Sequence, residues 1–401
     1  MSKLFEGLKV IDCGSFIAAP IAATLLGDFG ADVIKIEPPT GGGDPSRHLP
    51  KLPGMPKAEH PYGWLLDNRN KRGLALDLSK PDGQAILHRL VESADVFVTN
   101  YPLTVRNKLA IDYARLSKLN ERLVYASFTG YGETGDEAGK PGFDATAYWA
   151  RSGMMDLVRS DAATPPARAV AGMGDHPSGV ALFAAISLAL YQRERTGRGT
   201  QVGSSLLANG IFANGIMAQA ALCGATFTPR PPREENLNAL SCYYRCRDGR
   251  WLLLVIINDE RDWPTFATCI GRADLIDDPR YAKQADRFAH SAELIATFDE
   301  VFATRDRDDW RARLNAAGII FECVAEVEDL PGDRQMIETG VLLPIEGESM
   351  LTINSPFFVD GADKVPPHRA PGLGQHSDEI LRDAGYDDAT ITQLRERRIV
   401  L

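Results

Sequence analysis

The first third of the chain alternates between short, β-branched apolar runs and helical patterns, and this alternation restricts the fold more than any other feature. The apolar runs cover residues 8–13, 31–37, 73–78, 94–99 and 123–128. Helical patterns lie between several of them, at residues 18–28 and 80–93. A strand, a helix and a second strand at this spacing form a βαβ unit, which produces a parallel sheet. We therefore predict an α/β fold with a Rossmann-like large domain, whose ligands bind at the carboxyl ends of the strands.

The rest of the chain predicts a smaller domain and a return to the large one. Prolines and charges at residues 227–238 are typical of a linker, and residues 243–251 have the pattern of a β-hairpin with an Asp-Gly turn. Further helices are expected at residues 178–194, 206–222, 262–270, 292–304, 378–384 and 388–398, and a short strand at 201–203. We predict a large domain over residues 1–222, a linker and small α+β domain over 223–334, and a C-terminal return to the large domain over 335–401.

Composition excludes several classes of function. A chain of 401 residues is too long for one ordinary core, which favours two domains. The formal net charge of −10 argues against nucleic acid or an anionic membrane as the main partner. The six cysteines are scattered, Cys242 and Cys246 lack a second pair of ligands, and no secretory leader or membrane-spanning run is present. We therefore expect free thiols, no metal site and a cytoplasmic location.

Asp175 is the strongest candidate for a catalytic residue, because it stands directly before a long apolar helix. Gly174 and Gly179 flank it and permit close approach of another backbone or of a ligand. An Asp at a helix N-terminus is usually a cap whose pKa is lowered by backbone N–H groups. The helix is almost wholly apolar over residues 180–190, which predicts that it is buried and that the carboxylate at its tip is an ionised nucleophile. The adjacent His176 receives no role.

Two further segments contain groups that could hold a nucleotide. Lys71 and Arg72 precede a predicted strand and could neutralise a phosphate, although a solvated loop is the alternative. The second segment, at the end of a predicted strand, contains Asn100, Tyr101, Arg106 and Lys108. An aromatic ring and two cations at a strand end suit a nucleotide, and an ordinary surface helix is the alternative.

Several short motifs become informative through their order along the chain. They lie at residues 8–12, 29–37, 70–72, 129–132, 142–144, 174–179, 196–199 and 369–377. In order and spacing, over nearly the whole chain, these motifs resemble the class III CoA-transferases, the family that contains formyl-CoA transferase and carnitine CoA-transferase. The resemblance implies a Rossmann-like domain, a small domain and an interlocked homodimer. It also implies CoA and acyl-CoA as substrates, with no permanently bound cofactor.

The resemblance assigns roles to individual residues. The nucleophilic aspartate of the family falls on Asp175. Contacts with CoA fall on Ile17, Ala18, Leu76, Asn100, Tyr101, Lys108, Thr129, Gly130, Tyr131 and Gly132. Pro38 replaces an arginine that holds adenine in formyl-CoA transferase, so we expect Lys71 or Arg72 to hold adenine instead.

The implied activity is transfer of CoA from an acyl-CoA to a carboxylic acid, through an aspartyl anhydride and an aspartyl-CoA thioester. Intramolecular CoA transfer would use the same chemistry. The α-methylacyl-CoA racemases have Gly-His-Asp where this chain has Gly142-Phe143-Asp144. Phe143 cannot move a proton, which disfavours racemase activity. Asp144 itself is interpreted as a helix cap. A CoA-binding subunit without activity is disfavoured by an intact Asp175, and a NAD-dependent oxidoreductase by the lack of G-x-G-x-x-G at residues 14–20.

Overall fold

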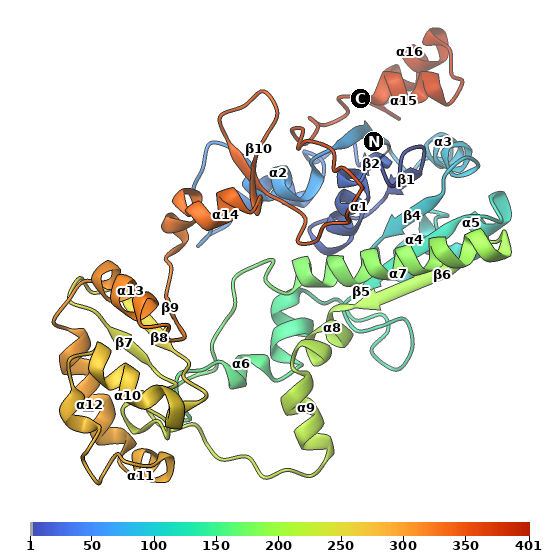
Figure 1. Cartoon of the computed structure of the whole chain (residues 1–401). Coiled ribbons are helices and arrows are strands. Elements are labelled where there is room, and N and C mark those ends of the chain that lie inside the picture. The colour runs from blue at the N-terminus through green and yellow to red at the C-terminus, as the bar shows by residue number, and fades with distance from the viewer. Residues whose placement is uncertain (1–2) are drawn as a thin grey trace. The chain divides into compact units, whose positions relative to one another are not determined.

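The computed structural model describes residues 3–401 and divides into two compact units (Figure 1). The larger unit consists of the chain up to Met155, of Arg168–Cys223 and of Arg334–Leu401. The smaller unit consists of Asp156–Ala167 and Gly224–Asp333. Residues 156–167 thus group with the smaller unit, whereas the sequence division assigned them to the large domain. Backbone contacts explain the difference, because Ala162 N donates to the main-chain oxygen of Arg230 at 3.0 Å.

A parallel sheet of six strands forms the centre of the larger unit, in the order β3-β2-β1-β4-β5-β6. Its strands are β1 (Lys9–Asp12), β2 (Asp32–Glu37), β3 (Lys71–Ala75), β4 (Val96–Thr99), β5 (Val124–Thr129) and β6 (Gln201–Ser205). The order reverses between β1 and β4, which is the point at which doubly wound sheets bind ligands. The predicted α/β fold with a Rossmann-like parallel sheet is confirmed.

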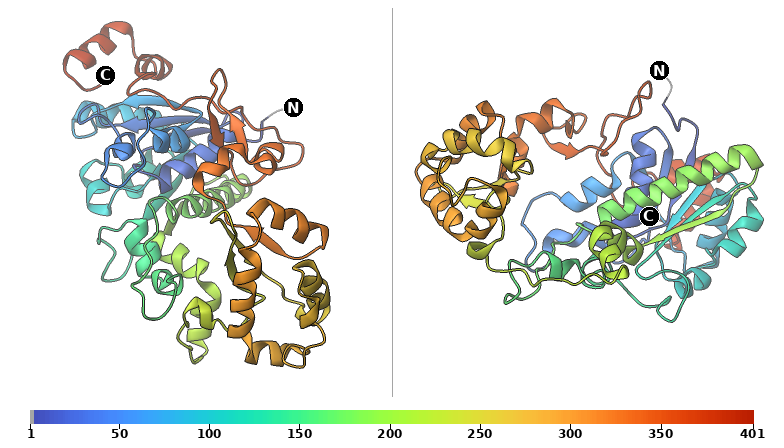
Figure 2. Two further views of the ribbon diagram at one scale, coloured as in Figure 1. Left: turned by 90° about the vertical axis from the view of Figure 1, so that its left-hand side faces the viewer. Right: turned by 60° about the horizontal axis from the view of Figure 1, so that its bottom comes forward.

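Successive residues of the strands point into different layers, as the period of two in a strand requires. Ile11, Phe97 and Tyr125 pack against one layer of helices, and Val10 and Val124 pack against the other. The first layer contains α3 (Pro81–Val91), α5 (Tyr113–Leu119), α15 (Ser377–Asp383) and α16 (Asp388–Glu396). The second contains α1 (Ala18–Asp28) and α7 (Asp175–Thr196). Figure 2 shows α7 and the C-terminal helices on opposite sides of the sheet.

Shorter elements complete the larger unit. They are η1 (Pro45–Lys51), α2 (Tyr62–Asn68), α4 (Leu103–Lys108), the π-helical η2 (Asp144–Ala150), α8 (Leu206–Ala213), α9 (Gly215–Leu222), α14 (Arg334–Glu338) and the antiparallel pair β10 (Leu342–Pro344) and β11 (Leu351–Ile353). The short helix α6 (Met154–Leu157) begins in the larger unit and ends in the smaller one. The single helix predicted at residues 206–222 is wrong, since α8 ends before Asn214. The Asn214 side chain donates to the main-chain oxygen of Ser152 at 2.8 Å, which fixes the break.

The smaller unit is built on an antiparallel sheet of three strands, β7 (Tyr243–Arg245), β8 (Trp251–Leu254) and β9 (Phe321–Cys323). Aromatic side chains, among them Tyr244, Phe298 and Trp310, pack in its core with leucine and isoleucine. The helical segments of this unit are η3 (Arg233–Glu235), α10 (Asp259–Cys269), η4 (Ala273–Leu275), α11 (Gln284–Ala289), α12 (Ser291–Phe302), α13 (Arg307–Ala316) and η5 (Val327–Gly332).

Helix α7 is not buried as the sequence suggested. One side packs on α1 and the sheet through Leu182 and Ile186, whereas Leu188 and Tyr191 on another side are 71% and 64% exposed. A helix on the surface of a single sheet can bury only one stripe, so the remaining apolar residues stay uncovered in one chain. Across residues 3–401, no helix combines the length and apolar character needed to cross a membrane.

Candidate active site

Asp175 is the first residue of α7, and Gly174 precedes it as the N-cap. The sequence placed the helix start three residues later and treated Asp175 as a possible cap with a lowered pKa. Burial, followed by the negative charges of Asp144 and Asp67, instead raises the pKa of Asp175 to about 7, and His176 opposes this rise. The predicted direction is therefore wrong, because the desolvation of a carboxylate in this acidic corner outweighs the helix N-terminus.

The glycines on either side of Asp175 permit close packing, as the sequence predicted. A Cβ atom on Gly174 would lie 2.7 Å from Cγ of Tyr148, which η2 contributes. A Cβ atom on Gly179 would lie 2.5 Å from Cγ2 of Ile21 and 2.8 Å from the main-chain oxygen of Ala18. The first turn of α7 therefore lies directly against the start of α1. This contact brings Asp175 toward the loop that follows β1.

Asp144 secures the turn that leads into α7. It is buried, and its Oδ2 atom accepts hydrogen bonds from Gly172 N at 2.8 Å and from Gly174 N at 3.4 Å. Its Oδ1 atom accepts from Ala145 N at 2.7 Å. The carboxylate thus holds the backbone before Asp175, although the sequence suggested only a cap. Phe143, beside it, is 61% exposed, and its ring meets the ring of Phe16 edge-on at 5.7 Å.

Asn100 fixes the loop after β1, which carries Ile17 and Ala18. Its Oδ1 atom accepts from Ser15 N at 2.8 Å, and its Nδ2 atom donates to the Ser15 oxygen at 2.7 Å. Phe16, the next residue, has a φ of 61°, a conformation that side-chain-bearing residues rarely adopt. Both polar atoms of Asn100 are committed to the backbone, so this side chain supports the loop.

The prediction that Lys71 holds adenine is wrong, because its ammonium is bonded within the protein. It is 4% exposed, and four oxygen atoms surround its ammonium at 2.7–2.9 Å, one more than its three N–H groups. These are Asp12 Oδ2, the main-chain oxygens of Pro20 and Asp67, and Asn68 Oδ1. Burial lowers its pKa to about 8, against the opposing charge of Asp12.

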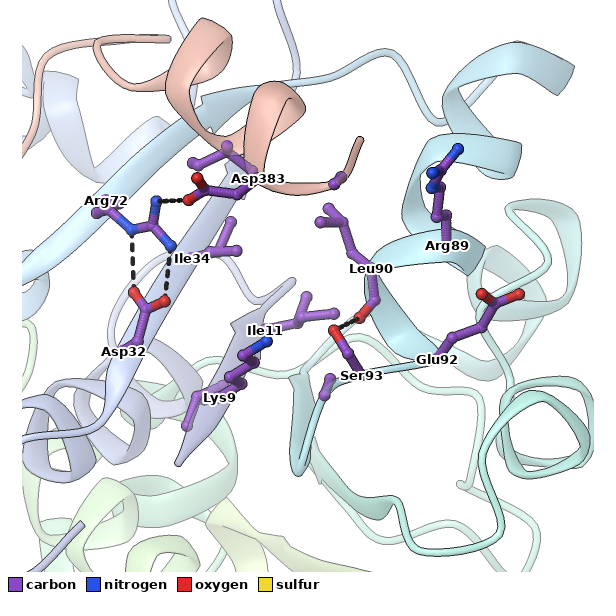
Figure 3. A pocket seen from close by; sticks show the side chains of 14 residues that line it. Lys9, Ile11, Asp32, Ile34, Arg72, Arg89, Leu90, Glu92, Ser93 and Asp383 are labelled. Atoms are coloured by element: carbon purple, nitrogen blue, oxygen red, sulfur yellow. Dashed lines mark hydrogen bonds and ion pairs between the residues drawn. The ribbon is translucent and has the colours of Figure 1, made fainter. Parts of the chain in front are cut away.

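The prediction that Arg72 holds adenine is also wrong, because Arg72 lies at the amino end of β3. Its guanidinium donates to Asp32, Glu379 and Asp383. There it lines a cavity of about 390 Å³ (Figure 3). Lys9 and Asp32, the first residues of β1 and β2, line the same cavity. CoA is expected at the opposite, carboxyl edge of the sheet, which the Arg72 side chain does not reach.

The remaining predicted residues follow the carboxyl ends of the strands. Ile17 and Ala18 follow β1, Leu76 follows β3, Asn100 and Tyr101 follow β4, and the segment Thr129, Gly130, Tyr131 and Gly132 ends β5. Thr129 Oγ1 accepts from Gly132 N at 2.9 Å, which shapes this last turn. Arg106 is buried, donates to the Tyr101 oxygen at 2.6 Å and lies 2.7 Å from Glu133. Lys108, at the end of α4, is exposed.

The comparisons with known proteins agree with this arrangement. Residues 5–377 match the family model described as CoA-transferase family III. The chain belongs to this family. It is 35% identical over 408 residues, 99% of each chain, to an (R)-2-hydroxy-4-methylpentanoate CoA-transferase of Clostridioides difficile. It is 32% identical to a cinnamoyl-CoA:phenyllactate CoA-transferase of Clostridium sporogenes, over 100% of this chain and 98% of that one.

A solved structure shows the same fold. The crystal structure of a CaiB/BaiF family protein from Brucella suis has a TM-score of 0.86 and 27% identity, and it covers 96% of this chain and 100% of its own. The resemblance of the motifs to the class III CoA-transferases is therefore confirmed, and this family III member is a CoA-transferase. CoA-transferases use CoA thioesters as substrates.

Sequence reasoning missed Asp67 in the site. Asp67 lies in α2, and its Oδ1 atom is 3.0 Å from Nε2 of His176, which is 109 positions away in the sequence. No motif pairs two residues at that separation. The residues of α2, which ends at Asn68 just before the Asn70-Lys71-Arg72 motif, give no sign of a partner for Asp67.

Proposed function

We propose that this family III CoA-transferase moves CoA from an acyl-CoA donor to a carboxylic acid, with Asp175 as the nucleophile. The observation that carries this proposal is the position of Asp175: a part-buried carboxylate with a pKa of about 7 on the first residue of a long helix, whose start packs against the start of α1. A carboxylate with this pKa is substantially ionised at neutral pH and is more nucleophilic than an ordinary, more acidic carboxylate.

The reaction proceeds by exchange at three carbonyl carbons, those of the donor acyl group, of Asp175 and of the acceptor. The Asp175 carboxylate attacks the donor thioester, so that CoA thiolate leaves and a mixed anhydride forms. The thiolate then attacks the aspartyl carbonyl, which releases the donor acid and leaves an aspartyl-CoA thioester. The acceptor carboxylate attacks this thioester to form a second anhydride and free the thiolate. Attack of the thiolate on the acceptor acyl carbon gives the new acyl-CoA and restores Asp175.

CoA lies, in this proposal, along the carboxyl ends of β1, β3, β4 and β5. Its contacts are Ile17, Ala18, Leu76, Tyr101, Lys108 and the residues 129–132. Lys108 is the exposed cation of this set and suits a phosphate. Asn100 and Arg106 support this binding surface from within the protein, since they hold the main chain at Ser15 and Tyr101.

A homodimer is part of the proposal. Large apolar side chains are exposed on consecutive helices of the larger unit: Leu188 and Tyr191 on α7, Phe212 on α8, and Ile216 and Leu222 on α9. Large apolar side chains left exposed in such number are typical of surface that a second chain covers. Light scattering of the purified protein tests this arrangement, and a monomer would contradict it.

The covalent mechanism is tested by mass spectrometry after incubation with a panel of acyl-CoAs and a hydroxylamine quench. Acceptors should include 2-hydroxy-4-methylpentanoate and phenyllactate, the acids in the names of the two relatives. We expect a hydroxamate on the peptide that contains Asp175, and none in Asp175→Asn. An unmodified peptide with every acyl-CoA, in a protein that still binds CoA, would refute Asp175 as the nucleophile.

A further inference from the structure

His176 has a hydrogen-bond acceptor at each of its ring nitrogens. Nε2 lies 3.0 Å from Oδ1 of Asp67, and Nδ1 lies 2.9 Å from the main-chain oxygen of Gly172. A neutral imidazole carries one N–H group, and a carbonyl oxygen cannot donate. Both bonds therefore form together only when one further proton is present, either on Nε2 or on the Asp67 carboxyl group.

The charges around Asp67 indicate where this proton resides. The Asp67 side chain is 1% exposed, and burial raises its pKa overall, although His176, Lys71 and Arg69 oppose this rise. The pKa of His176 is also raised, because the bond to Asp67, the charge of Asp67 and the bond to the Gly172 oxygen together outweigh burial. The acceptor at each ring nitrogen, together with the cations Lys71 and Arg69 beside Asp67, favours the arrangement in which the ring is an imidazolium and Asp67 a carboxylate.

This imidazolium adjoins an acidic corner. Asp144 from η2 and Asp67 from α2 bring negative charge close to Asp175, and His176 is the group that brings positive charge. Like charges near a carboxylate favour its neutral form, and a neighbouring cation favours the ionised form. The neutral form of Asp175 cannot attack a thioester.

We infer that Asp67 and the Gly172 oxygen hold His176 as a fixed imidazolium whose positive charge stabilises the ionised carboxylate of Asp175. His176 is then a positioning residue, since it acts on the reaction through the nucleophile. The inference rests on the role of Asp175 proposed above.

His176→Gln tests the charge, because glutamine keeps hydrogen-bond donors and loses the positive charge. We expect the midpoint of the pH profile for acylation of Asp175 to rise by about one pH unit. Acylation at about pH 6 then falls about tenfold, whereas the rate on the high-pH plateau is retained. His176→Arg restores a cation that can donate to both acceptors and should bring the midpoint back down.

His368→Gln is the matched control. His368 Nδ1 also lies beside a carboxylate, Glu346 Oε2 at 3.1 Å, but both side chains are more than half exposed. We expect its profile to coincide with that of the wild type. An unchanged midpoint in His176→Gln would overturn the inference. So would a midpoint in His176→Arg that equals the midpoint in His176→Gln.

Nitrogen-15 NMR of the histidine rings measures the charge without any acyl-CoA. The signal that disappears in His176→Gln should show two protonated nitrogens at about pH 7, above the ordinary pKa of histidine. A neutral ring at that pH would overturn the inference. If Asp175 is never acylated while His176 is doubly protonated, the nucleophile is wrong and the ion pair stands.

Discussion

Gly179→Ala measures how tightly the first turn of α7 is pressed against α1. In an open helical position, this substitution stabilises a protein by about 0.5–1 kcal/mol. At Gly179 the new methyl group would lie 2.5 Å from Ile21 Cγ2 and 2.8 Å from the Ala18 oxygen. The first separation is roughly 1 Å shorter than a normal carbon–carbon contact and the second roughly 0.5 Å shorter than a normal carbon–oxygen contact, and the oxygen belongs to a backbone that cannot rotate away. Overpacking of this kind costs about 1–3 kcal/mol, so the clash outweighs the gain in helix propensity.

The substitution should also reduce activity, because separation of α7 from α1 moves Asp175 relative to Ile17 and Ala18. A displacement of about 1 Å can cost about a hundredfold in rate. Urea unfolding followed by circular dichroism gives the stability, and single-turnover acylation gives the rate. Gly215→Ala in α9 is the control, since no atom lies within 4 Å of the added Cβ and we expect a small gain in stability. A Gly179→Ala protein with wild-type stability and acylation would refute the argument.

Three further predictions follow from the site. Because the pKa of Asp175 is raised to about 7, the stability of the folded protein falls as the pH rises from about 4 to about 7. Asp175→Asn should therefore be more stable than the wild type at about pH 8, by about 1–3 kcal/mol. Urea unfolding at about pH 4 should show no difference between the two proteins. Lys71→Met leaves the buried Asp12 without its closest cation and should cost about 3–5 kcal/mol in the same assay. Titration calorimetry should find unchanged CoA affinity in Arg72→Ala and an affinity about fivefold to tenfold weaker in Lys108→Ala, and equal losses in both would contradict the placement of CoA.

The sequence predicted the sheet well because its signal is local. The strands β1 to β5 coincide with short apolar runs, and the largest displacement is in β3, which ends at Ala75 and not at residue 78. The early start of α7 was not visible, because the hydrogen bond from His176 N to the Gly172 oxygen continues the helical pattern ahead of Pro177. Proline is tolerated in a first turn, where N–H groups have no helical partner.

The electrostatics of the site could not be predicted in the same way. Lys71 was assigned to a loop beside a ligand, whereas the folded chain buries it among oxygens from three other elements. The pKa of Asp175 depends on Asp67 and Asp144, which come from α2 and η2. A residue pattern shows which groups can ionise, but only the fold shows how much water they lose and which charges they meet.

The amine of Lys71 also limits how this protein can diverge. It contacts β1 through Asp12, α1 through Pro20 and α2 through Asp67. The oxygens of Pro20 and Asp67 belong to the main chain and stay in place whatever side chain those positions carry. Loss of Lys71 or of Asp12 alone leaves an unpaired polar group in the interior, so we expect these two residues to be exchanged together and not in single steps. Because α2 also carries the Asp67 side chain that pairs with His176, such an exchange would be felt near the nucleophile.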